Sequence, residues 1–160
     1  MEFLKDNFNG KVASPLTEFD FSIQNSVISF NFIAHDSTLI SYSSKNNDEL
    51  WRVNVVEIFL DCGDKDYYYE FEVAPNGAWF VAKKYVEHLE MIDNPQFIKI
   101  LNGISKNTYS VKIEIDLTKI PVKSLVKFNA FRIESGKKLE AFSPTYCSTF
   151  HVRERFVLLK

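Results

Sequence analysis

The chain is poor in the residues and patterns that mark several protein classes. Five glycines and five prolines among 160 residues are too few for a disordered or low-complexity chain. No apolar run approaches the roughly 18 residues that a membrane-spanning helix needs. The formal net charge is −2, whereas a nucleic-acid-binding protein normally carries a basic patch or stripe. We therefore expect neither a membrane nor a nucleic acid as partner.

Cysteine is also scarce. Cys62 and Cys147 form no C-x-x-C pair, which argues against zinc and thioredoxin-type sites. Two buried thiols are the simpler interpretation, since an unpaired cysteine often lies in the core, and a disulfide between the two stays open. The first fifteen residues lack an apolar stretch long enough for a secretory signal. The chain is then either intracellular or an exported protein without its leader.

Aromatic residues are abundant, and their distribution favours strands. They make up 15% of the chain, and 15 of them are phenylalanines. Runs typical of strands cover 19–21, 27–34, 39–42, 53–61, 67–74, 79–85, 97–101, 109–117, 126–134, 139–142 and 156–159. Turn signals separate them at 24–26 and 75–77, and helical turns are expected only at 86–93 and 116–121. This spacing predicts one all-β domain over 1–160, an antiparallel β-sandwich of the jelly-roll kind.

One of these runs carries a carboxylate among apolar residues. Glu57 lies between Val56 and Ile58, six residues after Trp51, and a carboxylate is rarely buried without a partner. A flat indole covers the C–H face of a sugar at little cost in rotamer entropy. Charged groups then make strong hydrogen bonds to the hydroxyls. Trp51 and Glu57 together indicate a neutral polar ligand such as a sugar.

The chain resembles carbohydrate-binding module family 9, within the DOMON-like group of β-sandwiches. Three segments carry the resemblance: Leu50-Trp51 with 56–61 (VEIFLD), 68–73 (YYEFEV) with Asn76-Gly77-Ala78, and the C-terminal stretches 131–134 (FRIE), 142–145 (FSPT), 150–151 (FH) and 155–156 (RF). The resemblance implies a jelly-roll-like, non-catalytic module that clamps a mono- or oligosaccharide between two tryptophans. Such modules commonly accompany glycoside hydrolases of polysaccharide catabolism. Trp51 matches the first clamp residue and Glu57 a ligand-binding glutamate, while Phe150 or His151 stands near the second clamp position.

The candidate ligand-binding residues are therefore Trp51, Glu57, Trp79, Arg132, Phe150 and His151. Each has a structural alternative. The indoles are equally suited to packing at the edge of the core, and Glu57 to an ion pair with Arg52 or Arg132. The corresponding alternative for the whole chain is an accessory or structural β-sandwich that has lost the sugar site.

Cofactors and catalysis find less support. Met91 and His88 stand too close in sequence to bind a haem from opposite faces. The loop 61–66 holds three aspartates, but glycine and glutamate are not at the positions that an EF-hand needs. We therefore expect no cofactor, with structural calcium kept open by the family resemblance. Glu57, Glu70 and Glu72 could supply a glycosidase pair, but no nucleophile motif accompanies them. The sugar and the oligomeric state are left open.

Overall fold

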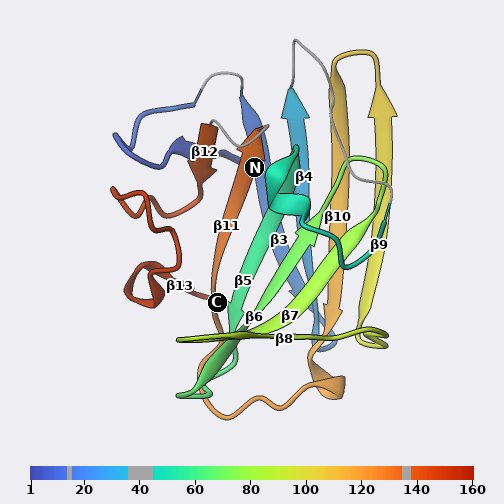
Figure 1. Ribbon diagram of the computed structural model, residues 1–160, viewed down its shortest axis with the longest axis vertical. Coiled ribbons are helices and arrows are strands. Elements are labelled where there is room, and N and C mark those ends of the chain that lie inside the picture. Colours follow the sequence, from blue (N-terminus) through green and yellow to red (C-terminus); the bar gives the residue numbers. More distant parts are fainter. Residues whose placement is uncertain (14–15, 36–44, 135–137) are drawn as a thin grey trace.

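The computed structural model describes residues 1–13, 16–35, 45–134 and 138–160. In these ranges the strands form two antiparallel sheets (Figure 1). The first sheet has the order β1 (Glu2–Phe3), β3 (Thr17–Gln24), β4 (Val27–His35), β10 (Thr108–Asp116) and β9 (Ile98–Ser105). The second has the order β2 (Lys5–Asp6), β12 (Lys138–Ala141), β11 (Lys127–Glu134), β5 (Val55–Asp61), β6 (Tyr67–Val73), β7 (Trp79–Tyr85) and β8 (Leu89–Met91), with β13 (Val157–Leu158) paired to β11. The all-β antiparallel sandwich predicted from the sequence is confirmed.

The hairpin of β3 and β4 shows how the local sequence sets the register. Asn25 and Ser26 have φ of 50° and 65°, and two left-handed residues between paired strands form the turn that matches the strand twist. Gln24 therefore pairs with Val27, and alternate residues of β4 point into the core. The turn predicted at 24–26 is confirmed.

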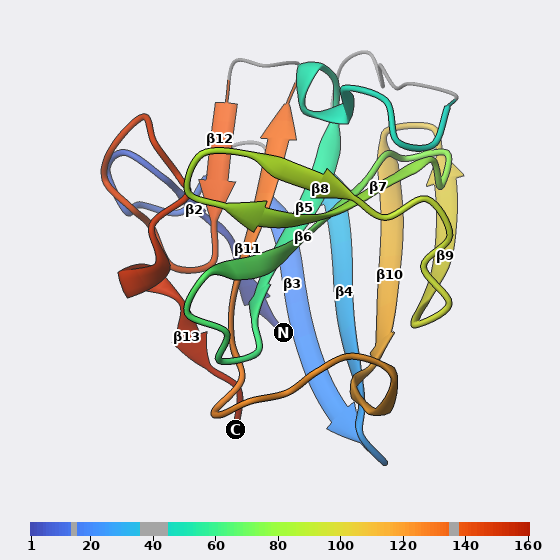
Figure 2. The same cartoon turned by 60° about the horizontal axis from the view of Figure 1, so that its bottom comes forward.

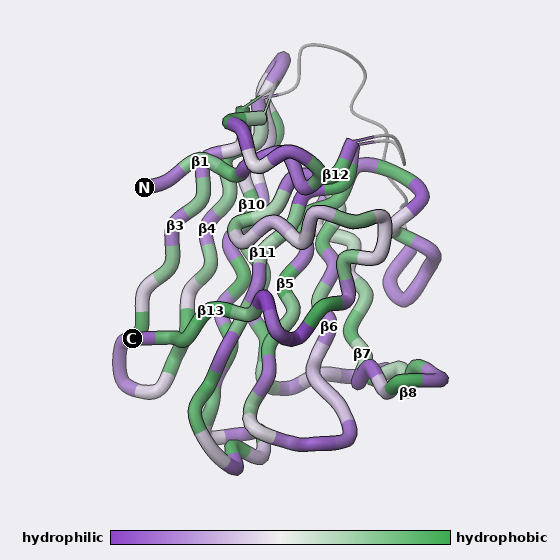
Figure 3. Tube along the Cα trace, turned by 90° about the vertical axis from the view of Figure 1, so that its left-hand side faces the viewer, coloured by the Kyte–Doolittle hydropathy of each residue, from purple (hydrophilic) through white to green (hydrophobic). Residues whose placement is uncertain are grey.

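The central strands of the second sheet, β5, β6 and β11, are buried on both faces. The inner face of this sheet packs against the first sheet in the main core, whereas its outer face carries two further apolar clusters. For this reason β5, β6 and β11 read as nearly continuous buried runs rather than as alternating ones. Figure 3 looks onto this side, where the chain after β12 crosses in front of the sheet.

Two buried asparagines anchor that crossing segment to the rest of the molecule. The Asn7 side chain accepts a hydrogen bond from the Thr145 N–H at 2.9 Å and donates to Thr145 Oγ1 at 2.9 Å. Asn129 of β11 likewise accepts from the Ser143 N–H at 2.9 Å and donates to the Ser143 carbonyl at 2.8 Å. Because buried amides must be paired, these four bonds fix the segment over the outer face.

Several local predictions need correction. The helical turn expected at 86–93 is wrong, because this stretch forms the β7–β8 hairpin (Figure 2). The Tyr85 N–H donates to the His88 carbonyl at 3.0 Å, and the two rings stack 4.4 Å apart. The turn within 116–121 is confirmed as η2 (Leu117–Lys119), while η1 (Leu50–Arg52) and η3 (Arg153–Arg155) were not predicted. The strand predicted at 39–42 lies outside the described residues.

The two cysteines are free, so the disulfide does not form. Cys62 is buried as expected, but Cys147 is exposed, because it lies in the segment that crosses the outer face. The helical elements of the described chain are three-residue turns, and none has the length and hydropathy to cross a membrane.

Candidate functional site

A pocket of about 450 Å³ opens on the outer face of the second sheet. This volume lies in the range of small-molecule sites, roughly 300–1,000 Å³. Its floor comes from β6, β7, β11 and β12, and its walls come from η1, the turn after β2, the start of β8 and the crossing segment. The lining residues are Phe8, Trp51, Glu70, Glu72, Lys84, Leu89, Ile133, Lys138, Leu139, Ser148, Phe150 and His151.

Trp51 forms one wall. The single turn η1 presents it, because the preceding Leu50 is fully buried in the outer apolar cluster and holds the turn against the sheet. The Trp51 ring meets Phe80 edge to face, with centroids 5.7 Å apart and an interplanar angle of 79°. Only part of the indole is buried, so the remainder is available to a ligand in the pocket.

Phe150 and His151 form another wall. Both rings stack on Phe59, with centroids 5.7 Å and 4.7 Å from it and interplanar angles of 13°. His151 Nδ1 lies 2.5 Å from the Tyr68 hydroxyl oxygen. Burial, and then the charge of Lys84, lower the pKa of His151 to about 4. The imidazole is therefore neutral near pH 7 and offers one ring nitrogen as donor and the other as acceptor.

Three carboxyl groups gather at the floor. Glu57 of β5 pairs directly with Glu72 of β6, and such cross-strand partners share a face of the sheet. Glu70 lies two residues from Glu72 and therefore points to the same side. The side chains of Glu70 and Glu72 line the pocket, while Glu57, which is 0% exposed, lies beside Glu72 within the same layer.

Burial makes these acids hard to ionise. It raises the pKa of Glu57 well above its usual range, and the neighbouring Glu70 adds to the effect. Burial, followed by the charges of Glu57 and Glu70, likewise raises the pKa of Glu72. Burial raises the pKa of Glu70 only to about 7, because the adjacent Glu72 carboxyl and the Lys84 ammonium oppose it. Near neutral pH, Glu57 and Glu72 are thus protonated, whereas Glu70 is about half ionised and is the acid of the three that most readily carries a charge.

The ion pairs expected for Glu57 are not formed. Arg52 pairs with Glu49, and Arg132 lies 3.7 Å from Glu140. Among the described residues, neither oxygen of Glu57 has a hydrogen-bond partner. A buried acid without a hydrogen-bond partner is costly for stability.

We expect stability to fall between about pH 7 and pH 8, since Glu57 and Glu72 stay protonated when folded and ionise when unfolded. His151, with its lowered pKa, acts in the opposite direction but only below the pKa of about 6.5 that it has when unfolded. Urea denaturation at the two pH values measures the slope. Glu57→Gln should make it shallower by up to about 1.4 kcal/mol per pH unit. The exposed Glu87→Gln is the control, and equal slopes in both variants would contradict the assignment.

Comparison with known proteins shows which structures share this fold. No protein-family model matches the chain. A crystal structure of a candidate carbohydrate-binding protein from Bacteroides uniformis superposes with a TM-score of 0.80 at 17% identity, covering 99% of this chain and 84% of that one. Family 9 carbohydrate-binding modules from Caldicellulosiruptor kristjanssonii, in complex with glucose and with cellotriose, superpose with TM-scores of 0.59 and 0.60 at 16% identity. They cover 88% of this chain and 73% and 71% of theirs. The chain has the fold of the family 9 carbohydrate-binding modules.

One relative of known sequence also matches the chain, and its description names no activity. An "Extracellular protein" from Arthroderma benhamiae is 27% identical over 170 residues, which cover 89% of this chain and 77% of the relative. The superpositions on the family 9 modules confirm, for the fold, the resemblance seen in the sequence.

The six predicted ligand residues do not lie together: they are divided among the pocket, a separate cleft and the core between the sheets. Trp51, Phe150 and His151 line one pocket, and Glu57 lies beside its floor. Trp79 instead lies in a separate, polar cleft of about 420 Å³, together with Asn76, Asn94 and Asn102 among others. Arg132 is buried on the inner face of the sheet, where it donates to Thr17 Oγ1 at 3.0 Å.

Sequence reasoning missed Lys84 and gave Glu70 and Glu72 no ligand role. The signal was present, because Tyr68, Glu70 and Glu72 alternate with apolar residues along β6, and the register places Lys84 opposite Tyr68. Phe8, Leu89 and Ser148 carried no such signal, since turns and loops bring them to the pocket.

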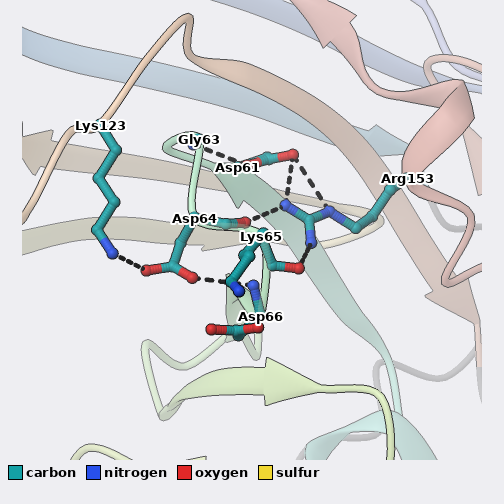
Figure 4. Close-up of polar contacts among 7 residues, drawn as sticks. All are labelled: Asp61, Gly63, Asp64, Lys65, Asp66, Lys123 and Arg153. Carbon is teal, nitrogen blue, oxygen red and sulfur yellow. Dashed lines mark hydrogen bonds and ion pairs between the residues drawn. The ribbon is translucent and has the colours of Figure 1, made fainter.

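The acidic loop 61–66 of the family 9 fold is contacted by two cationic side chains (Figure 4). The Arg153 guanidinium lies 2.9 Å from Asp61 Oδ2 and donates to the Lys65 carbonyl at 3.1 Å. Lys123 Nζ lies 2.6 Å from Asp64 Oδ2. The described residues include no group of three or more His, Cys, Asp or Glu side chains arranged to hold a metal. Arg153 also ties the segment that carries Phe150 and His151 to the β5–β6 turn.

Proposed function

We propose that this chain is a non-catalytic carbohydrate-binding module that holds a saccharide in the pocket on the outer face of its second sheet. The observation that carries the proposal is the position of Trp51 and of the Phe150–His151 pair around a floor lined by Glu70 and Glu72. Aromatic walls suit the C–H faces of a sugar ring, and a polar floor suits its hydroxyls. The glucose and cellotriose complexes of the family 9 neighbours support the same ligand class.

Each polar group has a defined part in this proposal. A protonated Glu72 donates a hydrogen bond, whereas the Glu70 carboxylate accepts one and Lys84 donates. The Tyr68 hydroxyl keeps its proton, because burial above all raises its pKa. In this proposal it donates to His151 Nδ1, and the imidazole proton is then on Nε2. The pocket can then both donate to and accept from a polyhydroxylated ring. We expect affinities from millimolar to micromolar, since the site is open and wet.

The test is calorimetric titration with glucose, cellobiose and xylo-oligosaccharides. Trp51→Ala should weaken binding by about tenfold or more, since truncating a stacked tryptophan commonly costs about 1–2 kcal/mol or more. Trp79→Ala removes the other indole, outside the pocket, and should leave the affinity unchanged. Circular dichroism checks that both variants fold.

Two results would contradict the proposal. One is a Trp51→Ala protein that binds as tightly as the wild type. The other is a wild-type protein that binds none of the sugars, which would favour an accessory or structural sandwich without a sugar site.

A further inference from the structure

The floor of the pocket has more carboxyl groups than nearby cations. Glu70 is 5% exposed and Glu72 is 1% exposed, and both line the pocket. The backbone N–H of Trp51 and the Glu70 carboxyl group approach Glu72. No described residue, however, makes a hydrogen bond of ordinary geometry to either Glu72 oxygen, nor to Glu70 Oε2. Glu57 adds a third buried carboxyl from the neighbouring strand, also without a hydrogen-bond partner. Such groups in a cavity point to a ligand that supplies the missing donors.

The cations around the floor are too few to pair with all three carboxyl groups. Burial raises the pKa of Glu70, while the Glu72 carboxyl group and then Lys84 of β7 oppose that rise, so Lys84 is the counter-charge of one carboxylate. Lys138 of β12 also lines the pocket, but it lies 3.9 Å from Glu134. Tyr68 and His151 face the floor in their neutral forms. Glu57 and Glu72 keep their protons because burial raises their pKa, the neighbouring carboxyl groups raise it further, and no counter-charge offsets either effect. A ligand cation in the pocket would supply that counter-charge.

We propose that the saccharide bound in this pocket is an amino sugar, whose ammonium group lies against the carboxyl groups of Glu70 and Glu72. This inference rests on the proposed function and specifies its ligand class. An ammonium offers three donors, and a hydrogen bond between two charged groups is roughly twice as strong as a neutral one. A uronic acid would bring a further anion to the same floor and is disfavoured.

Binding of an amino sugar should release a proton from the protein, and this release can be measured. The ammonium ligand R–NH₃⁺ meets the acid form of Glu72, and the product is an R–NH₃⁺ and Glu72 carboxylate pair with one proton released to the buffer. The O–H bond of the acid breaks, and no other covalent bond changes. Glucose and N-acetylglucosamine carry no charge, so they bind without this release. The affinity for the amino sugar should therefore rise with pH as long as its amine stays protonated.

The experiment is isothermal titration of the whole chain with glucosamine, glucose and N-acetylglucosamine near pH 7, in two buffers of different ionisation enthalpy. We expect glucosamine to bind about tenfold more tightly than glucose, with release of up to about one proton. Glu72→Gln should bring the ratio of the two affinities toward one and abolish the proton release. The exposed Glu87→Gln is the matched control and should keep both.

The outcomes separate this inference from the proposed function. Binding of glucose with no preference for glucosamine would overturn the amino-sugar assignment and leave the sugar site intact. A preference that stays undiminished in Glu72→Gln would overturn it as well. Glu70→Gln tests the same ratio if Glu72→Gln does not fold. Failure of all three sugars to bind would contradict the proposed function itself.

Discussion

Arg132→Ala is expected to lower the free energy of unfolding by about 3–5 kcal/mol, the usual cost of removing one partner from a buried ion pair. Arg132 is 0% exposed, donates to Thr17 and lies 3.7 Å from Glu140. Its guanidinium also lies 5.6 Å from the centre of the Tyr109 ring. The substitution would leave a cavity between the sheets and a carboxyl group of Glu140 without its cation.

The control replaces both partners rather than one. A double variant, Arg132→Met with Glu140→Leu, fills the space with apolar atoms, and such replacements are often close to neutral. Urea denaturation of both proteins gives the comparison. A loss below about 1 kcal/mol in Arg132→Ala would contradict the burial described above, whereas a sugar affinity that falls in the folded double variant would place Arg132 in the binding site after all.

Phe59→Ala is the second large effect, with an expected loss of about 3–5 kcal/mol. Phe59 is fully buried at the centre of the outer aromatic cluster. Its ring centroid lies 4.9 Å from Phe131 and 4.7 Å from His151, and Phe150 stacks on it at 5.7 Å. Because Phe150 and His151 form a wall of the pocket, the variant should lose sugar affinity together with stability.

Thermal unfolding and sugar titration of Phe59→Ala measure the two effects. Phe3→Ala is the matched control, since Phe3 is 46% exposed and a surface change should stay within about 0.5 kcal/mol. Phe59→Leu keeps most of the volume and should recover part of both quantities. A destabilised Phe59→Ala protein with unchanged affinity would show that the wall does not depend on this ring.

The strands could be predicted because their residues alternate or are continuously apolar between turn residues. The side that each residue faces could not be predicted in the same way. Arg132 alternates with Phe131 and Ile133, but both faces of β11 are buried, so polarity does not tell which face is the pocket side. Trp79 has the same ambiguity, and its position alternates with Phe80, which lies in the outer cluster.

The aromatic wall was foreseen only through the family resemblance. Phe150 and His151 lie in an irregular segment, and long-range contacts place it, such as those of Asn7 with Thr145 and of Arg153 with Asp61. No periodic pattern encodes contacts of this kind. The hairpin at 86–93 was mistaken for a helical turn for a related reason, because the stacking of Tyr85 on His88 and the pairing of Lys83 with Glu90 are contacts across the turn.

The most direct test follows the two tryptophan indole N–H signals by ¹H–¹⁵N NMR while glucose, cellobiose or glucosamine is added. The indoles belong to different cavities, since Trp51 lines the pocket on the outer face and Trp79 lines the polar cleft. We predict a saturable shift of the Trp51 signal while the Trp79 signal stays in place. A saturable shift of Trp79 alone, or no shift of either signal across the three sugars, would contradict the central claim that the pocket beside Trp51 binds a saccharide.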